Sequence, residues 1–258
     1  MADLLWYQYA LIGITFIWSG FVRSGLGFGG AVLSLPFLLL IAELPQAYLA
    51  LIAVHLMVFS SITVYKNLRA AKKTTPEGLV PASTVDWAYL KFALLVMIVP
   101  KMIGVFGLLT LPSGLMSNII FGIVLVYALS YILDRPFRSN NKVLDIAFLM
   151  LGGYVSGTSL IGAALIIAVF ATHVAKEQLR DTLFTLWFIL VFIKMTAFVY
   201  AGVDLQLIHH LWLLPCAAIG HFIGLRFHQK LLQADSRQFF RVLGSVLLVI
   251  SVIGIYKA

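Results

Sequence analysis

The sequence contains 258 residues, of which 62% are hydrophobic and 11% are charged, and its mean hydropathy is +1.02. A water-soluble chain of this length cannot bury so much apolar surface, so the composition excludes a soluble protein and predicts an integral membrane protein. The net charge of +8 fits basic loops that orient a membrane bundle better than it fits nucleic-acid binding. Cys216 is the single cysteine, which excludes an intramolecular disulfide.

Ten apolar segments follow one another along the chain. They lie at 5–22, 29–42, 46–65, 88–109, 114–133, 144–159, 161–174, 182–200, 208–226 and 239–256. A helix that crosses the bilayer needs about 20 residues. The segments 29–42 and 161–174 contain only 14 residues each, so we expect half-helices or re-entrant segments there. The start, MADLLWYQYALIG, lacks the basic region and cleavage site of a signal peptide.

Basic residues gather in alternate connections between the segments. Twelve of the 18 lysines and arginines are Lys66, Arg69, Lys72, Lys73, Arg135, Arg138, Lys142, Lys176, Arg180, Arg226, Lys230 and Arg237. The connections 43–45, 110–113 and 201–207 contain none. Because cytoplasmic loops carry the excess of lysine and arginine, we expect the basic group in the cytoplasm and both termini outside. The largest basic connection is the predicted cytoplasmic loop 66–87.

The two halves of the chain resemble each other. GFVRSGLGFGGAVL at 20–33 is similar to GYVSGTSLIGAAL at 153–165, and PKMIGVFG at 100–107 is similar to PCAAIGHFIG at 215–224. Five segments in each half place the second copy upside down in the bilayer. We therefore predict an all-α membrane protein of two inverted repeats, residues 1–134 and 144–258. Short broken helices are expected near 23–42 and 156–174, as in transporters whose substrate binds between such repeats.

The glycine-rich breaks indicate an anion site. A half-helix that begins inside the membrane exposes unpaired N–H groups and the positive end of its dipole, and glycine lets the backbone approach a ligand. Helix starts near Gly29 and Ile161 would point at one shared centre. Hydroxyl groups at the same breaks can donate further hydrogen bonds. The residues expected at the site are Ser24, Gly25, Gly27, Gly29, Gly30, Ser156, Gly157, Thr158, Ser159 and Gly162. The alternative is that these glycines only allow close helix packing.

The charged residues agree with an anionic ligand. All ten acidic residues lie at segment ends or in connections: Asp3, Glu43, Glu77, Asp86, Asp134, Asp145, Glu177, Asp181, Asp204 and Asp235. Three basic residues, Arg23, Lys101 and Lys194, lie at a break or inside a span, and such residues mark functional sites. Alternatively, the lysines snorkel to an interface, and Arg23 is a topology anchor.

Histidines are further candidate site residues, whereas motifs of known enzyme classes are missing from the sequence. His55 lies in the middle of a span and either packs as a polar core residue or contacts the substrate or a proton, whereas His209 and His210 look interfacial. The sequence has no Walker loop and no metal-ligand spacing, so we expect neither an enzyme nor a metal or other cofactor.

The motifs described above resemble the TauE/SafE family of membrane permeases. SGLGFGGAVLSLPFLLL, its weaker copy SGTSLIGAALIIA and the paired proline–glycine segments carry the resemblance along the whole chain. The second copy departs from the family at 158–161, TSLI, where glycines are frequent. The resemblance implies export of sulfite, or movement of sulfonates and other small sulfur-containing anions. The positions that match the family motif are Ser24, Gly25, Gly27, Gly29, Gly30, Ser156, Gly157 and Gly162.

The sequence therefore predicts a secondary transporter of sulfite or a short organosulfonate, in a multi-pass bundle of the cell membrane and, in a bacterium, of the inner membrane. Export is expected because the membrane potential, negative inside, drives an anion outward. The alternatives are an importer of a small sulfonate or carboxylate, a passive anion channel, and a membrane assembly or sensor protein. The expected partners are the anion and the lipid bilayer, with no nucleic acid, and a homodimer is one oligomeric state left open.

Overall fold

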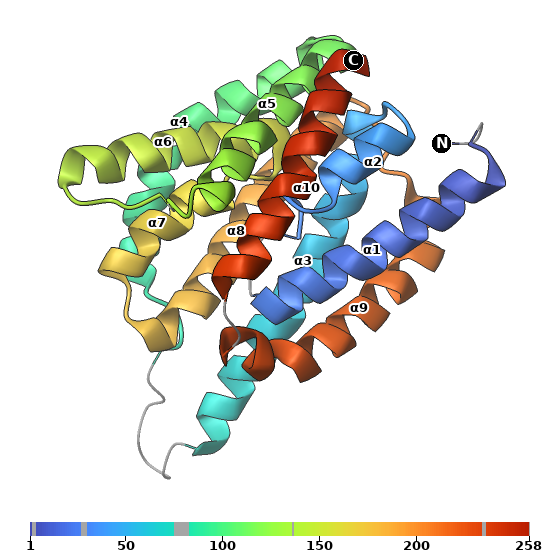
Figure 1. The fold of residues 1–258 in the computed structure, drawn as a ribbon. Coiled ribbons are helices and arrows are strands. Elements are labelled where there is room, and N and C mark those ends of the chain that lie inside the picture. Colours follow the sequence, from blue (N-terminus) through green and yellow to red (C-terminus); the bar gives the residue numbers. More distant parts are fainter. Residues whose placement is uncertain (2–3, 27–29, 75–82, 136, 234–235, 258) are drawn as a thin grey trace.

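The computed structural model describes residues 1, 4–26, 30–74, 83–135, 137–233 and 236–257, and these form ten α-helices (Figure 1). The helices are α1 (Trp6–Leu26), α2 (Leu35–Ile41), α3 (Pro45–Thr74), α4 (Trp87–Thr110), α5 (Ser113–Ile132), α6 (Lys142–Ser159), α7 (Ala163–His173), α8 (Lys176–Tyr200), α9 (Leu207–Gln233) and α10 (Ser236–Lys257). All ten predicted segments correspond to helices, and the all-α membrane fold is confirmed.

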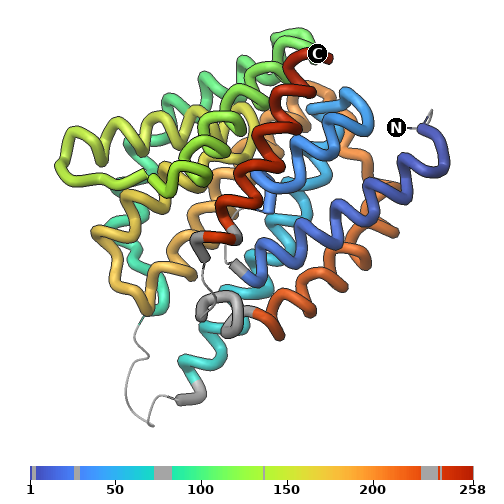
Figure 2. The backbone as a smooth tube through the Cα atoms, in the orientation of Figure 1, coloured from blue at the N-terminus to red at the C-terminus, as the bar shows by residue number. Residues whose placement is uncertain are grey.

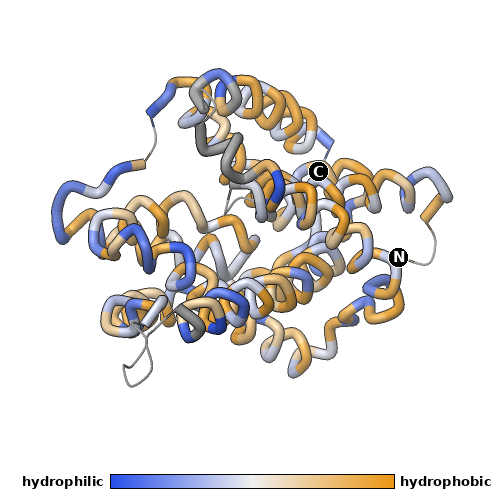
Figure 3. The backbone as a smooth tube through the Cα atoms, turned by 90° about the horizontal axis from the view of Figure 1, so that it is seen from below, coloured by the Kyte–Doolittle hydropathy of each residue, from blue (hydrophilic) through white to orange (hydrophobic). Residues whose placement is uncertain are grey.

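Six of the described helices are long and apolar enough to cross a bilayer: α3, α4, α5, α8, α9 and α10. Hydrophobic residues follow most of the length of the helices, and hydrophilic residues gather mainly at helix ends and in connections (Figure 3). Large apolar side chains such as Leu95, Ile103 and Phe106 on α4 are exposed at the surface of the bundle. In water this surface would be costly, whereas lipid tails solvate it. The protein is a multi-pass membrane protein.

The start of the described chain and the last turns of α10 lie on the side of the molecule opposite the end of α3 (Figure 2). This agrees with the predicted common location of the termini. We call the end with the connections α3–α4, α5–α6, α7–α8 and α9–α10 the basic end. The predicted loop 66–87 needs a correction, because α3 continues as a helix to Thr74. Its residues 75–82 lie outside the described part.

The helices pack in pairs that cross between the two halves. Helix α1 packs along α9, α4 along α6, α3 along α8 and α5 along α10 (Figure 1). Exchanging the first five helices for the last five turns the pair α1–α9 into α6–α4 and leaves the pairs α3–α8 and α5–α10 unchanged. This is the pattern that two symmetry-related copies would produce. The inverted orientation of the repeats in a bilayer and the domain limits 1–134 and 144–258 stay predictions.

Glycine allows two of these pairs to approach closely. A Cβ atom on Gly220 of α9 would overlap the carbonyl oxygen of Ile17 on α1. A Cβ atom on Gly157 of α6 would overlap the carbonyl oxygen of Lys101 on α4 and lie 3.0 Å from the Cα of Gly104. Small residues at helix contacts are the usual means of tight packing in membranes. For Gly157 the structure therefore fits the packing alternative.

Each half contains a helical hairpin whose short second arm begins inside the bundle. In the second half, α6 ends at Ser159, Leu160 adopts the left-handed conformation with φ of 60°, and α7 begins at Ala163. The predicted break near Ile161 is therefore correct to within two residues. In the first half the prediction was less accurate. Residues 30–34 form a turn, and α2 begins only at Leu35 and has seven residues. Pro36 near its start accounts for the late beginning, because proline favours the first turn of a helix.

In each hairpin, a side-chain contact joins the two helices at the open end. The Gln8 side chain of α1 donates a hydrogen bond from Nε2 to the Ile41 carbonyl at the end of α2, 2.8 Å away. At the basic end, Asp145 in the first turn of α6 forms an ion pair of 2.8 Å with His173, the last residue of α7. These contacts hold the short helices α2 and α7 against their partners, with their first residues in the interior.

Candidate functional site

A small cavity of about 50 Å³ lies where the two breaks meet. Residues from α1, α3, α6, α7, α8 and α9 and from the turn 30–34 form its wall. We call it the central cavity; it is lined by Phe16, Ser19, Arg23, Gly30, Ala31, Val32, Ile52, His55, Leu56, Ser60, Ser156, Leu160, Gly162, Ala163, Phe184, Trp187, Leu190, Val191 and Ala217. Its volume is enough for a ligand of a few non-hydrogen atoms. Among the described residues, no aspartate or glutamate lines it.

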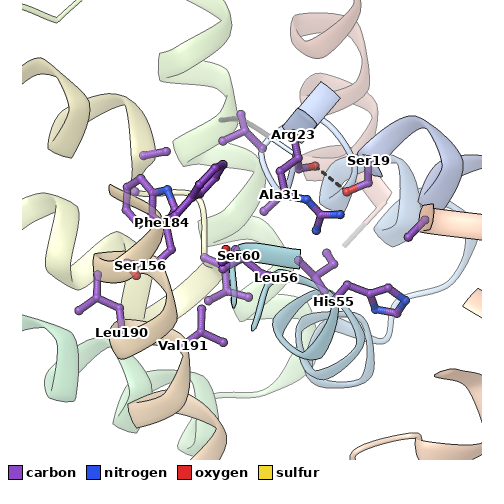
Figure 4. Close-up of a pocket in the computed structure, with 18 of the residues that line it drawn as sticks. Ser19, Arg23, Ala31, His55, Leu56, Ser60, Ser156, Phe184, Leu190 and Val191 are labelled. Carbon is purple, nitrogen blue, oxygen red and sulfur yellow. Dashed lines mark hydrogen bonds between the residues drawn. The ribbon is translucent and has the colours of Figure 1, made fainter. Parts of the chain in front are cut away.

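Arg23 is the charged residue of the central cavity. It lies within α1, which continues to Leu26, and its side chain is buried with 9% exposure. Its Cζ lies 4.4 Å from the centre of the Phe59 ring, and its Nε and Nη2 atoms have no hydrogen-bond partner among the described residues. In Figure 4 the side chain extends from α1 toward α3, which carries His55, Leu56 and Ser60. Such burial is unlike that of a topology anchor, which would reach water.

The turn after α1 brings backbone and hydroxyl groups to the same wall. The carbonyl oxygen of Gly30 accepts hydrogen bonds from Ser19 and Ser34. A Cβ atom on Gly30 would lie 3.1 Å from the Cβ of Arg23, so a side chain here would crowd the arginine. The helix α2 behind this turn is too short to supply a substantial dipole. The first break therefore contributes mainly a cation, not the helix end that the sequence suggested.

The second break contributes a helix start and a serine. Gly162 is the N-cap of α7, and both Gly162 and Ala163 line the cavity. No side chain caps this helix start. A Cβ atom on Gly162 would overlap the carbonyl oxygen of Gly152, which explains the requirement for glycine. Ser156, one turn before the end of α6, also lines the cavity. With 11 residues, α7 is long enough for its positive end to attract an anion.

Lys101 reaches the site indirectly. Its side chain is fully buried, and Nζ donates hydrogen bonds of 3.2 Å to both the carbonyl oxygen and the Oγ of Ser156. It does not line the central cavity itself. Lys101 therefore positions a cavity residue, and it does not snorkel to an interface.

Lys194 is also fully buried and lies outside the lining of the central cavity. Its Nζ lies 6.0 Å from the centre of the Phe198 ring and has no hydrogen-bond partner among the described residues. The structure thus separates the two lysines from Arg23, which the sequence grouped with them.

Three hydroxyl groups expected at the site are engaged elsewhere. The Thr158 and Ser159 hydroxyls donate to the carbonyl oxygen of Val155, one turn earlier in α6. Ser24 is within hydrogen-bonding distance of His221 Nδ1 on α9. Gly25 is buried at the contact of α1 with α9, where a Cβ atom on Gly224 would lie 2.9 Å from its nitrogen. Gly27 and Gly29 lie outside the described residues.

His55 lines the central cavity, and its predicted contact with the substrate stays a prediction. Its Nδ1 lies 2.6 Å from the Leu51 carbonyl oxygen, and its Nε2 has no partner among the described residues. The ring centre lies 5.2 Å from that of His210 on α9. His210 is buried with 6% exposure and packs against α3, while its predicted location near the membrane interface stays a prediction. Sequence reasoning also missed Ser19 and Trp187, which carry no motif and are brought to the cavity only by helix packing.

A second, narrower cavity adjoins the central one toward the basic end. It is lined by Arg23, Ser24, Phe59, Ser60, Thr63, Arg180, Phe184 and His221, and we call it the inner cavity. Arg23, Ser60 and Phe184 belong to both cavities. Among the described residues, no group of three or more histidine, cysteine, aspartate or glutamate side chains is placed to hold a metal ion.

A helical membrane bundle with two interior helix breaks, and between them a cavity that contains an arginine and several hydroxyl groups, has the architecture of a membrane permease. The family model described as "Sulfite exporter TauE/SafE" matches residues 11–254. The chain therefore belongs to the TauE/SafE sulfite exporter family, as the sequence motifs indicated. No curated protein and no solved structure matches it.

Proposed function

We propose that this protein is a secondary transporter that exports a small sulfur-containing oxyanion, sulfite or a short organosulfonate, through the central cavity. Membership of the TauE/SafE family supports the class of substrate. The observation that carries the proposal is Arg23, a permanent cation buried at a cavity without a carboxylate.

The energetics of Arg23 favour an anion as its partner. Burial of an ion costs several kcal/mol even after relaxation, and a nearby opposite charge offsets that cost. Two guanidinium nitrogens of Arg23 lack protein acceptors among the described residues. An oxyanion presents several oxygen acceptors to such a donor and forms short charge-assisted hydrogen bonds. We expect Arg23 to hold the anion, with the Ser156 hydroxyl and the start of α7 as further donors.

Size and potential also support export of a small anion. The cavity volume of about 50 Å³ suits a compact oxyanion better than a large organic substrate. A potential of 100 mV, negative inside, contributes about 2.3 kcal/mol per unit charge to outward movement of an anion. Rocking of the halves around the cavity would expose the anion to each side in turn.

The test is flux of labelled sulfite from proteoliposomes that contain wild type, Arg23→Gln or Arg23→Lys. We expect Arg23→Gln to reduce flux at least tenfold and Arg23→Lys to retain part of it, because lysine keeps the charge but loses the planar donor pair. Arg241→Gln is the matched control, since Arg241 is an exposed arginine of α10. Full flux in Arg23→Gln, or equal losses in both glutamine variants, would contradict the proposal. Inhibition of sulfite flux by methanesulfonate would indicate that sulfonates bind, and inhibition by acetate would indicate that carboxylates bind.

A further inference from the structure

The inner cavity places a second arginine opposite Arg23. Arg180 lies in the second turn of α8, and its Cζ is 5.5 Å from the centre of the Phe184 ring. Arg23, which also lines the inner cavity, lies against Phe59 in the same way. The Nε atoms of both arginines are buried without a hydrogen-bond partner among the described residues. Two cations that share one small cavity repel each other unless an anion lies between them.

The carboxylate next to Arg180 is engaged elsewhere. Asp181 is buried, does not line the inner cavity, and accepts a hydrogen bond of 2.7 Å from Asn67 Nδ2 on α3. The other polar residues that line the inner cavity are Ser24, Ser60, Thr63 and His221. Ser24 and His221 bond to each other, the Thr63 hydroxyl donates to the Phe59 carbonyl oxygen, and the Ser60 hydroxyl has no partner among the described residues. Since none of the described lining residues carries a negative charge, the charge that would balance the two arginines is left to a ligand.

The inner cavity lies between the central cavity and the basic end. On α3, Thr63 of the inner cavity is eight positions closer to the basic end than His55 of the central cavity. On α8, Arg180 is four residues after Lys176, the first residue at the basic end. An anion that arrives from the basic end meets Arg180 before it meets Arg23.

In this structure the inner cavity is closed. It contains no space for a water-sized group. Phe184 belongs to both cavities and lies against Arg180, so movement of these two side chains is the simplest way to open the route.

We propose that Arg23 and Arg180 form a second, inner binding site for a small oxyanion, occupied when the anion enters from the basic end. The inference rests on the proposed function and adds a step to it. The anion is first held between the two guanidinium groups and then passes to the central cavity, while Arg23 stays bound to it. Arginine suits this relay because its planar donors bind two oxygens at once.

The test compares the two sides of the membrane. Proteoliposomes with uniformly oriented protein receive labelled sulfite either at the basic end or at the opposite end, and the KM for each direction is measured. We expect Arg180→Gln to raise the KM at the basic end at least tenfold and to change the KM at the opposite end less than twofold. Arg180→Lys should lie between wild type and the glutamine variant. Arg226→Gln, an exposed arginine of α9, is the control for loss of surface charge.

An unchanged KM at the basic end, or equal changes at both ends, would overturn the inner site. Should Arg180→Gln fail to fold, the comparison of Arg180→Lys with wild type at the two ends decides in the same way. The inference and the proposed function fail differently. Full transport by Arg23→Gln removes both, whereas loss of transport in Arg23→Gln together with an unaltered Arg180→Gln removes the inner site alone.

Discussion

Replacement of Gly220 by alanine tests whether close packing of α1 and α9 holds the site in place. The new Cβ would overlap the Ile17 carbonyl oxygen and lie 2.8 Å from both the Ile17 carbonyl carbon and the Phe21 nitrogen. Ordinary contact begins at 3.4 Å, so the two atoms at 2.8 Å alone require a shift of about 0.6 Å, and the nearer carbonyl oxygen requires a larger one. All three atoms belong to the backbone and cannot rotate away.

Overpacking of this kind costs about 1–3 kcal/mol, and the better helix propensity of alanine returns up to about 1 kcal/mol. The net loss of about 1–2 kcal/mol should lower the melting temperature in detergent by a few degrees. Arg23 lies six residues after Ile17 on the displaced helix, so we also expect sulfite flux to fall several-fold.

Gly122→Ala is the matched control, because Gly122 lies in α5 and no atom lies within 4 Å of the place that the new methyl group would occupy. That variant should melt at or above the wild-type temperature and transport normally. If Gly220→Ala behaved like Gly122→Ala in both melting and flux, the packing argument would be refuted.

Two further predictions concern buried charges. Lys101→Met should weaken equilibrium binding of labelled sulfite several-fold, because Lys101 positions Ser156. Lys194→Met should change this binding less than twofold, because Lys194 does not line the central cavity. Equal effects of the two variants on sulfite binding would contradict these different roles. Asp145→Asn should lower the free energy of unfolding by only about 0.5–1 kcal/mol, and the melting temperature correspondingly little, because the side chain of its partner His173 is 40% exposed. Measurement of Asp145→Asn, His173→Gln and the double variant gives the coupling energy, and a coupling of zero would show that the pair does not fasten α7.

The sequence predicted the helices well because the bilayer imposes a strong constraint. Apolar runs of spanning length can only be helices in lipid, and the boundary of α7 followed from a glycine at a break. The start of α2 was harder to predict, because residues 30–34 are as apolar as a helix and only Pro36 marks the true beginning. The extension of α3 to Thr74 was missed because its last turns are polar.

The site was predicted less completely, since the arrangement of side chains depends on how the halves cross. Gly30, Ser156 and Gly162 could be named from the repeated motif and Arg23 from its charge at the first break, and the structure brings them to one cavity. The separation of Lys101 and Lys194 from that cavity could not be read from their positions in a span. Arg180 was interpreted only as part of a basic loop, because its contact with Phe184 depends on the side-chain conformation within α8.

The pairing of His55 with His210 joins helices far apart in the sequence, so no local pattern could indicate it. The burial of His210 within the protein could not be predicted from its place near a segment start. α9 begins at Leu207, and His210, on the first turn, faces α3 instead of the surface.

The central claim is that Arg23 binds the transported anion in the central cavity. The most direct test is a structure of the protein with selenite, the selenium analogue of sulfite, located by its anomalous scattering. We expect one strong peak within hydrogen-bonding distance of the Arg23 guanidinium group, near Ser156 and the start of α7. A peak beside Lys194 with the central cavity empty would contradict it.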